Sequence, residues 1–320
     1  MKKSLCILLV CLMLLPMLAA CQTPKAPENE STPQITQPTT PPPAEPTDPV
    51  DDGNTEPEPM EGIDKTKHYS ILFIGNSYTF YPGKNNQFSA SMPASLFAPM
   101  ADSAGYTVTV EMITVPGNYL YKFDDPTDTE GGGDKVAKAL SEENYGKYDF
   151  VILQDHSQSV LKDVDRFYSS VRSLVGKIRA IGAQPILYAT WGRKAGHQIL
   201  YTYNLTNESM TWKITAAYTA IGRELDVPVA NVGLAFFAAQ KSVEIYDEDR
   251  SHPSYAGSYL IAATLFATIF NEDPEAAVTY MGDSRITKAQ AEFLRHTAKQ
   301  AVFSTPAIPE EYQTTTTPGT

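Results

Sequence analysis

A serine, a histidine and an aspartate, three residue types that together perform nucleophilic chemistry, stand at distinctive places in this sequence. Ser77 follows residues 71–74, a short apolar run closed by Gly-Asn-Ser, which is typical of a buried strand that stops at a tight turn. A hydroxyl at the carboxyl end of a parallel strand faces the region where such sheets bind ligands. The same tripeptide also suits an ordinary strand-ending turn. The interpretation of Ser77 therefore depends on whether the chain supplies a base.

A histidine far along the chain is the candidate for that base. Of the five histidines, His252 stands immediately before a richly apolar stretch, and Asp249 precedes it by three residues. In a turn, this spacing can bring the carboxylate to the imidazole Nδ1–H. An acidic loop before a helix has the same composition, so the pair gains weight only beside Ser77. Together the three residues have the types that a base-activated serine nucleophile needs.

The elements that must position these residues follow an alternating pattern. Apolar runs predict strands at 70–74, 107–113, 149–153, 184–189 and 227–232, and longer stretches predict helices at 86–104, 135–144, 164–181, 207–225, 254–270 and 287–303. Such alternation is typical of a parallel sheet, and right-handed crossovers place helices on both of its faces. The sequence therefore predicts an α/β fold, a three-layer α/β/α sandwich around a flavodoxin-like parallel five-stranded sheet.

The N-terminus has the three parts of an export signal. Lys2 and Lys3 precede an apolar run at 5–18, and the small residues Ala19 and Ala20 follow it. Residues 18–21, Leu-Ala-Ala-Cys, resemble a bacterial lipobox, which implies cleavage before Cys21 and a lipid on its thiol. We therefore expect residues 1–21 to be a lipoprotein signal peptide. The mature protein is then exported, anchored to the bacterial cell membrane through Cys21, and faces outside.

Composition separates the rest of the chain into three parts. Eleven of the 24 prolines fall in residues 22–66 among Thr, Glu and Asp, which predicts a disordered linker that acts as a semi-rigid spacer. We expect residues 67–303 to form one globular domain. The Pro- and Thr-rich residues 304–320 are predicted to be a disordered tail. The chain carries a net charge of −12 and has no basic stripe, so we expect no nucleic-acid partner.

Two connections are too long to be plain turns. Residues 115–134 include Asn118 and Tyr119, and residues 190–206 include Trp191. Both connections should leave carboxyl ends of strands, on the same side as Ser77. Their aromatic rings can line a cleft for a sugar or can pack the loops down, and both interpretations stay open. Asn118, Tyr119 and Trp191 are the candidates for lining the substrate site.

Three blocks of the sequence resemble the SGNH (GDSL-type) hydrolase superfamily. They are residues 75–79 (Gly-Asn-Ser-Tyr-Thr), 153–157 (Leu-Gln-Asp-His-Ser) and 251–254 (Ser-His-Pro-Ser). More narrowly, they resemble the uncharacterised SGNH-like branch whose first block reads Gly-Asn-Ser. The resemblance covers about residues 69–303 and implies that this part is an SGNH hydrolase-like domain.

Roles for individual residues follow from the resemblance. It implies Ser77 as the nucleophile, His252 as the general base and Asp249 as the orienting partner of His252. It also implies an oxyanion hole made by the backbone N–H of Ser77, a glycine N–H after the second strand and a side-chain amide after the third. Gly117 is the candidate glycine, with a plain turn glycine as the competing interpretation. Gln154 is the expected third donor, and Asn118 is its substitute.

The resemblance implies a serine esterase that hydrolyses acyl esters through a Ser-His-Asp triad and an acyl-enzyme. We expect the substrate to be a small-molecule or glycan ester, most simply an acetyl ester of extracellular carbohydrate. Neither a cofactor nor a metal ion is expected. Two alternatives stay open. One is a non-catalytic glycan-binding lipoprotein on the same scaffold, and the other is a lipase or thioesterase.

Overall fold

A five-stranded sheet forms the centre of the computed structural model, which describes residues 63–83 and 93–313. The strands are β1 (His68–Gly75), β2 (Thr107–Thr114), β3 (Phe150–Leu153), β4 (Gln184–Tyr188) and β5 (Val229–Ala230). They lie in the order β2-β1-β3-β4-β5, and each neighbouring pair is parallel. This is the flavodoxin-like order, so the predicted fold class is confirmed.

Helices connect the strands and follow the last of them. The α-helices are α1 (Ala98–Ser103), α2 (Leu120–Asp124), α3 (Gly133–Ala139), α4 (Ser159–Lys162), α5 (Val164–Ala180), α6 (Gln198–Thr202), α7 (Asn207–Leu225), α8 (Val232–Ala239), α9 (Tyr255–Phe270), α10 (Pro274–Ala277) and α11 (Lys288–Phe303). A π-helical turn, η2 (Pro93–Phe97), precedes α1, and 3-10 turns lie at η3 (Glu142–Asn144) and η4 (Glu310–Tyr312).

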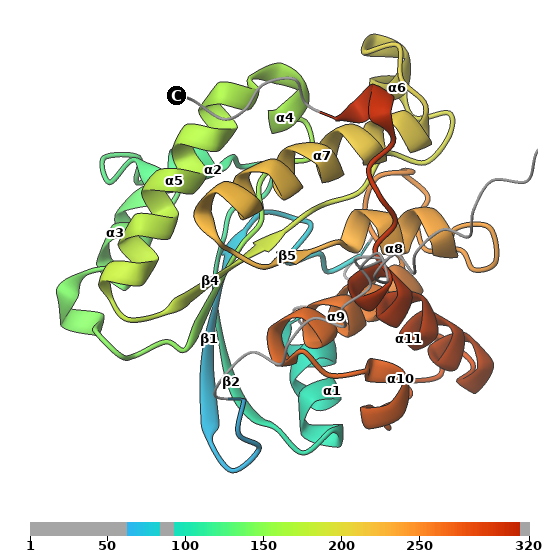
Figure 1. The fold of residues 1–320 in the computed structure, drawn as a ribbon, viewed down its shortest axis with the longest axis horizontal. Helices are drawn as coiled ribbons and strands as arrows, with labels where there is room; N and C mark the ends of the chain where they lie inside the picture. Colours follow the sequence, from blue (N-terminus) through green and yellow to red (C-terminus); the bar gives the residue numbers. More distant parts are fainter. Residues whose placement is uncertain (1–62, 84–92, 314–320) are drawn as a thin grey trace, which may run out of the picture. The chain divides into compact units, whose positions relative to one another are not determined.

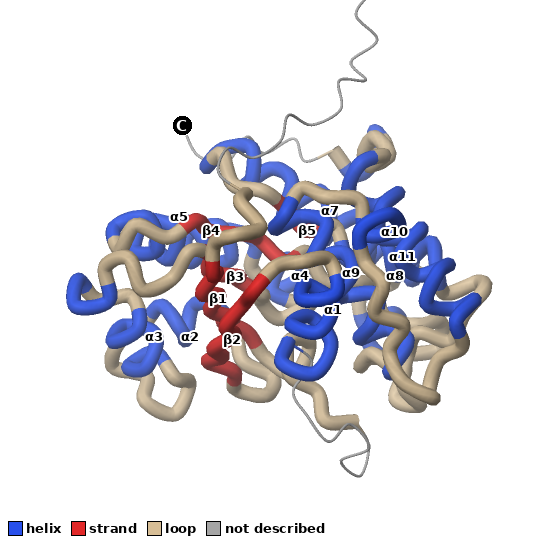
Figure 2. The backbone as a smooth tube through the Cα atoms, turned by 90° about the horizontal axis from the view of Figure 1, so that it is seen from below, coloured by secondary structure: helices blue, strands red, loops and turns tan. Residues whose placement is uncertain are grey.

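Alternate side chains of β1 belong to different cores, because successive residues of a strand point to opposite faces of a sheet. Ile71 and Phe73 pack with α1, α8, α9 and α11, whereas Leu72 and Ile74 pack with α2, α3, α5 and α7. Figure 1 shows these two groups of helices on either side of the strands, and Figure 2 shows the strands between α2, α3 and α5 on one side and α1, α9 and α11 on the other. The result is the three-layer sandwich.

Helix α9 is apolar all round and is buried along its whole length. A helix of this kind belongs inside a protein, and α9 packs against α11 on its outer side. Its N-cap is Ser254, whose side-chain oxygen accepts a hydrogen bond from the Gly257 N–H at 3.1 Å. Because His252 lies two residues before this cap, the buried helix anchors the loop that carries the candidate base.

Several predicted boundaries differ from the structure. The last strand is shorter than predicted, because the chain turns into α8 at Val232, and α8 itself was not predicted. Its apolar residues continue those of the strand, so the sequence shows no change of period there. The helix predicted at 86–104 is described only from Pro93, where it consists of η2 and α1. The helix predicted at 135–144 ends at Ala139.

The predicted disorder of the C-terminal tail is wrong for residues 304–313. Ile308 and Tyr312 pack against the core, and Thr305 accepts a 3.4 Å hydrogen bond from Asn231. These two apolar side chains dock a segment whose other residues are small, proline or polar. The predicted signal peptide, Cys21 and the linker as far as residue 62 lie outside the described residues, as do residues 314–320.

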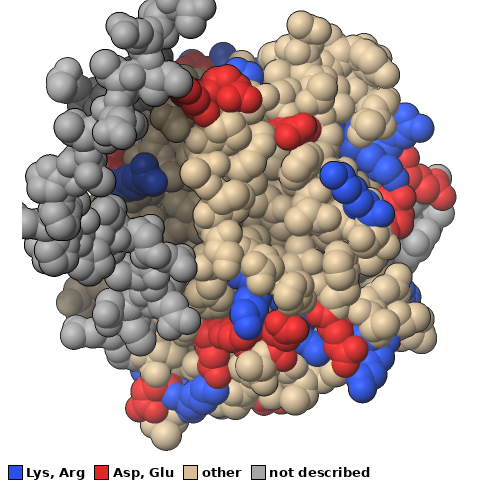
Figure 3. Space-filling model, turned by 45° about the vertical axis from the view of Figure 1, so that its right-hand side comes forward, with Lys and Arg blue, Asp and Glu red and all other residues tan. Residues whose placement is uncertain are grey.

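The surface of the described residues carries mixed charge. On the face drawn in Figure 3, Lys and Arg side chains lie among Asp and Glu side chains and form no continuous basic stripe. No helix within 63–83 and 93–313 is both long enough and apolar enough to cross a membrane. In the same residues, no group of three or more His, Cys, Asp and Glu side chains is placed to hold a metal ion.

Candidate active site

Ser77 lies in a tight turn at the carboxyl end of β1, a strand with neighbours on both sides. The turn packs closely against the end of β3. A Cβ on Gly75 would lie 2.6 Å from both the Gln154 Oε1 atom and the Thr79 Oγ1 atom, so only glycine fits there. Asn76 closes the turn, since its backbone oxygen accepts hydrogen bonds from the N–H groups of Thr79 and Phe80. Ser77 is held half-buried at the rim of the sheet.

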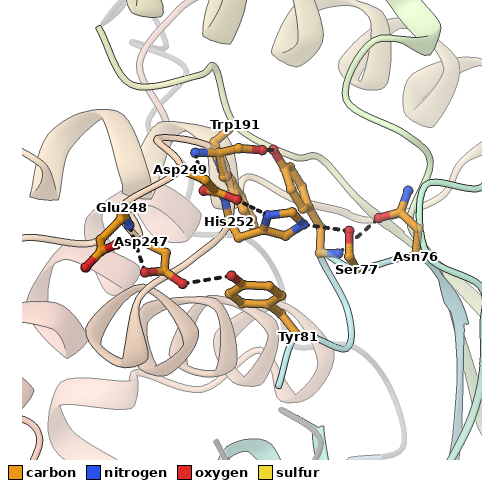
Figure 4. Close-up of polar contacts among 10 residues, drawn as sticks. Asn76, Ser77, Tyr81, Trp191, Asp247, Glu248, Asp249 and His252 are labelled. Atoms are coloured by element: carbon orange, nitrogen blue, oxygen red, sulfur yellow. Dashed lines mark hydrogen bonds and ion pairs between the residues drawn. The ribbon is translucent and has the colours of Figure 1, made fainter. Parts of the chain in front are cut away.

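His252 and Asp249 meet Ser77 at this rim. The Nε2 atom of His252 lies 2.8 Å from the Ser77 hydroxyl, and its Nδ1 atom lies 2.5 Å from the Asp249 carboxylate. Figure 4 shows the three side chains in line, although Ser77 and His252 are 175 residues apart in sequence. The structure therefore brings together all three residues that were predicted to form the triad.

Asp249 and His252 lie in one loop between Tyr246 and Pro253. These two residues form an antiparallel bridge that closes the loop, and the loop positions Asp249 and His252 relative to each other. Arg250 takes a left-handed conformation with φ of 61°, which turns the chain back on itself. The Asp249 carboxylate can then accept the backbone N–H groups of Ser251 and His252, both at 2.9 Å. One loop thus positions both the imidazole and the carboxylate that orients it.

Electrostatics keep the Asp249 carboxyl ionised. Partial burial raises its pKa, but hydrogen bonds from the His252 ring and from the backbone N–H groups of His252 and Ser251 lower it by more. The net result is a pKa well below the usual value for aspartate. A carboxylate that stays charged can hold the Nδ1 proton of His252 and leave Nε2 free to accept the serine proton.

Two tyrosine rings hold the His252 imidazole in place. Tyr81 stacks on it with ring centroids 4.2 Å apart, and Tyr78 meets it edge-on at 5.6 Å. The Tyr81 hydroxyl donates to the Asp247 carboxylate at 2.8 Å, as Figure 4 shows. These contacts fix the plane of the imidazole, because each ring is itself anchored.

The predicted backbone donors lie beside Ser77. Gly117 follows β2, is exposed and lines the cleft above the serine. Its φ of 68° lies in the left-handed region that favours glycine. Within the described residues, neither the Ser77 N–H nor the Gly117 N–H donates to another group. Both are therefore free to meet an oxyanion.

The prediction of Gln154 as the third donor does not fit the structure. Gln154 is fully buried, and its Oε1 accepts hydrogen bonds from the Asn76 N–H at 2.9 Å and the Thr79 hydroxyl at 3.0 Å. Its amide N–H donates to the Asp155 carbonyl. The Gln154 side chain instead ties the serine turn to the end of β3.

The substitute donor, Asn118, is also occupied elsewhere. It is buried, and its amide N–H donates to the Gly131 carbonyl at 2.7 Å. Asn118 therefore neither supplies the third donor nor lines the cleft. Its backbone carbonyl accepts the Asn76 side chain at 2.9 Å, so it supports the serine turn from the β2 side.

The prediction of Trp191 as a residue lining the substrate site is wrong. Trp191 is completely buried and stacks between Tyr78 at 4.2 Å and Phe236 at 4.0 Å. Its indole N–H donates to the Ser251 carbonyl at 3.0 Å. Trp191 supports the cleft from behind. Tyr119 lines a neighbouring pocket with Tyr121 and Lys162 rather than the cleft around Ser77.

The cleft around the triad has a volume of about 650 Å³ and is mostly apolar. Besides the triad residues Ser77 and His252, its wall includes Tyr78, Phe80, Tyr81, Pro82, Pro116, Gly117, His156, Ser157, Arg193 and Ser251. An ester placed over Ser77 is therefore in contact with aromatic and proline side chains and with few polar groups.

His156 and Arg193 are residues of the cleft to which the sequence analysis gave no role. The His156 Nδ1 atom accepts the Gln158 N–H at 3.1 Å, so a neutral ring carries its proton on Nε2. Burial, with smaller effects from the charges of Lys162 and His252, lowers the pKa of His156 to about 4. At neutral pH, His156 is therefore an uncharged hydrogen-bond donor. Both residues follow carboxyl ends of strands, a position that could have identified them.

Comparison with known proteins identifies the fold. A solved structure of a protein from Slackia heliotrinireducens, assigned to the SGNH hydrolases, is 29% identical with a TM-score of 0.52, over 63% of this chain and 100% of that chain. The chain with Ser77, His252 and Asp249 therefore has the SGNH-hydrolase fold. The resemblance of the three sequence blocks to that superfamily is thus confirmed in three dimensions.

A structure of lower identity also shares the fold. A DUF4886 family protein from Bacteroides uniformis is 18% identical with a TM-score of 0.61, over 76% of this chain and 98% of that chain. A variant of Axe2, an acetyl-xylooligosaccharide esterase from Geobacillus stearothermophilus, is matched at 19% identity and a TM-score of 0.47, over 63% and 94%. No protein-family model matches the chain, and no curated protein matches it. The SGNH-hydrolase fold is therefore recognised through structure.

Proposed function

We propose that this protein is a serine esterase that hydrolyses short acyl esters, most simply acetyl esters of carbohydrate outside the cell. The observation that carries the proposal is the hydrogen-bonded line from the Ser77 hydroxyl through His252 to Asp249. This geometry suits a hydroxyl that loses its proton to Nε2 as it attacks. The SGNH-hydrolase fold and the cleft over Ser77 support the proposal.

The reaction proceeds through an acyl-enzyme. The Ser77 oxygen attacks the ester carbonyl carbon while its proton passes to His252, and the carbonyl oxygen becomes an oxyanion that meets the N–H groups of Ser77 and Gly117. The intermediate collapses, the bond to the alcohol breaks, and the alcohol takes the proton from His252. Water then attacks the acyl group, His252 accepts a proton from it, and the proton returns to Ser77 as the carboxylic acid leaves.

Release of p-nitrophenol from p-nitrophenyl acetate tests the proposal. We expect Ser77→Ala to lower the rate at least about a thousandfold, because no other group replaces the nucleophile. Ser157→Ala is a matched control, since Ser157 is a buried serine of the same cleft whose hydroxyl has no hydrogen-bond partner within residues 63–83 and 93–313. A fluorophosphonate probe should label wild type and Ser157→Ala, but not Ser77→Ala.

The same probe separates the esterase from a non-catalytic glycan-binding protein. A folded wild-type protein that the probe does not label, and that releases no p-nitrophenol, would favour the binding protein. Equal rates for wild type and Ser77→Ala would remove Ser77 from the mechanism.

The apolar wall of the cleft favours a second candidate, a lipase or thioesterase that acts on longer acyl chains. Phe80, Tyr81, Pro82 and Pro116 present apolar surface near Ser77, and each buried methylene of an acyl chain contributes about 0.8 kcal/mol. A series of p-nitrophenyl esters from acetate to octanoate separates the candidates. The rate constant kcat/KM should be highest for acetate in a carbohydrate esterase and should rise with chain length in a lipase.

We also propose that the protein is a lipoprotein held at the bacterial cell surface through Cys21. The support is the sequence at residues 1–21. In a membrane fractionation, the wild-type protein should sediment with membranes and Cys21→Ser should not. Sedimentation of both proteins with membranes would contradict the lipid anchor.

A further inference from the structure

Arg193 is a buried cation in the wall of the catalytic cleft. It lies in the connection that follows β4, is 5% exposed, and lines the cleft together with Ser77 and His252. Its Nε and Nη1 atoms are enclosed and have no hydrogen-bond partner in the described residues. An arginine normally uses its five N–H donors, so this guanidinium is left incompletely paired.

Two other arginines of the described residues have polar partners. Arg172 forms two hydrogen bonds with the Glu224 carboxylate, at 2.5 and 2.8 Å. Arg295, which is 4% exposed, donates from Nη1 to the Tyr259 hydroxyl at 2.9 Å, and its Nε is buried without a partner in the described residues. Arg193 is as deeply buried as Arg295, but the structure places no comparable acceptor beside it. Arg193 therefore leaves two enclosed side-chain nitrogens without a partner, whereas Arg295 leaves one.

The contact between Arg193 and Tyr78 does not satisfy these donors either. The guanidinium carbon lies 5.0 Å from the centroid of the Tyr78 ring. A cation above a ring is attracted to its π-electrons, but this attraction supplies no acceptor for hydrogen bonds. The stack explains how Arg193 is held in position, and it leaves the enclosed Nε and Nη1 donors without a hydrogen-bond acceptor.

The charges near Arg193 leave room for an anion. No Asp or Glu side chain lies among the described residues that line the cleft. Asp249 and Tyr246 act on the pKa of Arg193 through their charges. Asp249 is already engaged by His252 and by two backbone N–H groups. Burial lowers the pKa of Arg193 to about 10, so the side chain stays charged at neutral pH.

We propose that Arg193 binds a carboxylate carried by the ester substrate, so that the enzyme selects anionic esters over neutral ones. This inference rests on the proposed esterase function and names its substrate class. A planar guanidinium matches the two oxygens of a carboxylate, and the apolar wall strengthens the attraction by excluding water. The carboxylate can belong to the alcohol, as in an acetylated uronic acid, or to the acyl group, as in the half-ester of a dicarboxylic acid.

Two matched substrate pairs test the proposal and distinguish these sources. The first pair is acetylated methyl glucuronoside and acetylated methyl glucoside, followed by release of acetate. The second pair is mono-p-nitrophenyl succinate and p-nitrophenyl butyrate, followed by release of p-nitrophenol. We expect the wild-type full-length protein to favour the anionic member of one pair by at least about tenfold in kcat/KM, chiefly through KM. The pair that shows the preference identifies the part of the substrate that carries the carboxylate.

Substitutions of Arg193 test whether this side chain causes the preference for anionic esters. Arg193→Met should bring the anionic-to-neutral ratio to about one, whatever happens to the absolute rates, and Arg193→Lys should keep part of the preference because it keeps the charge. Arg295→Met is the matched control, since it removes an equally buried arginine that does not line the cleft. Its ratio should equal that of wild type.

Two outcomes would overturn the proposal. One is a wild-type protein that does not favour the anionic member of either pair, and the other is an Arg193→Met protein with the wild-type ratio. If Arg193→Met does not fold, the wild-type and Arg193→Lys ratios still decide. Calorimetry with Ser77→Ala measures binding of the acetylated glucuronoside and of the succinate half-ester, because this variant binds the substrate without turning it over. Fluorophosphonate labelling of Arg193→Lys reports on Ser77 separately, so a failed substrate class is distinguished from a failed esterase.

Discussion

Asp249→Asn is the substitution that most directly tests how the triad works. The Asp249 carboxylate lies 2.5 Å from the His252 Nδ1 atom and faces the imidazolium that forms when Ser77 gives up its proton. Asparagine keeps the size of the side chain and one acceptor oxygen but removes the negative charge. The substitution therefore measures how much that charge stabilises the transition state.

The structure sets the expected magnitude. Two unit charges about 4 Å apart attract each other by about 4 kcal/mol at an effective dielectric constant near 20, and by about 1 kcal/mol in water. The Asp249 side chain is 44% exposed and the His252 side chain 25% exposed, so solvent screens the pair and its energy lies between these limits. We expect Asp249→Asn to raise the barrier by about 2 to 3 kcal/mol, a fall in kcat of roughly 30- to 150-fold.

Steady-state hydrolysis of p-nitrophenyl acetate measures this effect, with Asp247→Asn as the matched control. Asp247 belongs to the same loop, but its carboxylate accepts the Tyr81 hydroxyl rather than the imidazole. Asparagine removes the same charge there and still offers Tyr81 an acceptor, so kcat should stay within about threefold of wild type. Equal losses in the two variants, or an Asp249→Asn rate near that of wild type, would refute the reasoning.

Three further substitutions test other parts of the site. Burial raises the pKa of Asp155 from 3.8 to about 6, so the folded protein keeps a proton that the unfolded chain releases. Urea denaturation should show that wild type loses about 2 kcal/mol of unfolding free energy relative to Asp155→Asn between pH 4 and pH 7, and a constant difference would contradict this. Gly117→Ala meets no atom within 4 Å but strains a φ of 68°; it should cost about 1 kcal/mol of stability and lower kcat about tenfold. An unchanged kcat would remove its N–H from the oxyanion hole. Trp191→Ala deletes the ring between Tyr78 and Phe236 and should lower the free energy of unfolding by about 3 to 5 kcal/mol in thermal denaturation. Unchanged stability with a raised KM would instead indicate substrate contact.

Local patterns in the sequence were sufficient to predict the sheet and the residues nearest the chemistry. The apolar runs mark buried strands, and the turn after β1 presents Ser77 at a carboxyl end, where ligands bind in such sheets. The spacing of Asp249 and His252 places both in one short loop. These features depend on neighbours in sequence, which is why they could be identified without coordinates.

The roles of Gln154 and Trp191 could not be predicted in the same way. A glutamine after β3 can point into the cleft or back into the protein, and the choice depends on the backbone N–H of Asn76, which lies 78 residues away. Trp191 is enclosed because Tyr78 and Phe236, from distant segments, meet on its two faces. Packing across the fold decides both cases, and a linear pattern does not record it.

The shared loop of His252 and Asp249 also determines how the active site can come apart. The loop is closed by the bridge between Tyr246 and Pro253 and by the 2.8 Å hydrogen bond from the Asp247 N–H to the His252 carbonyl. When this short segment detaches from the rim, the imidazole and its carboxylate leave as one piece, still bonded to each other. Inactivation by local opening would therefore break the hydrogen bond between Ser77 and His252 first, while the sheet stays folded. Return of the loop to the rim would then restore the site.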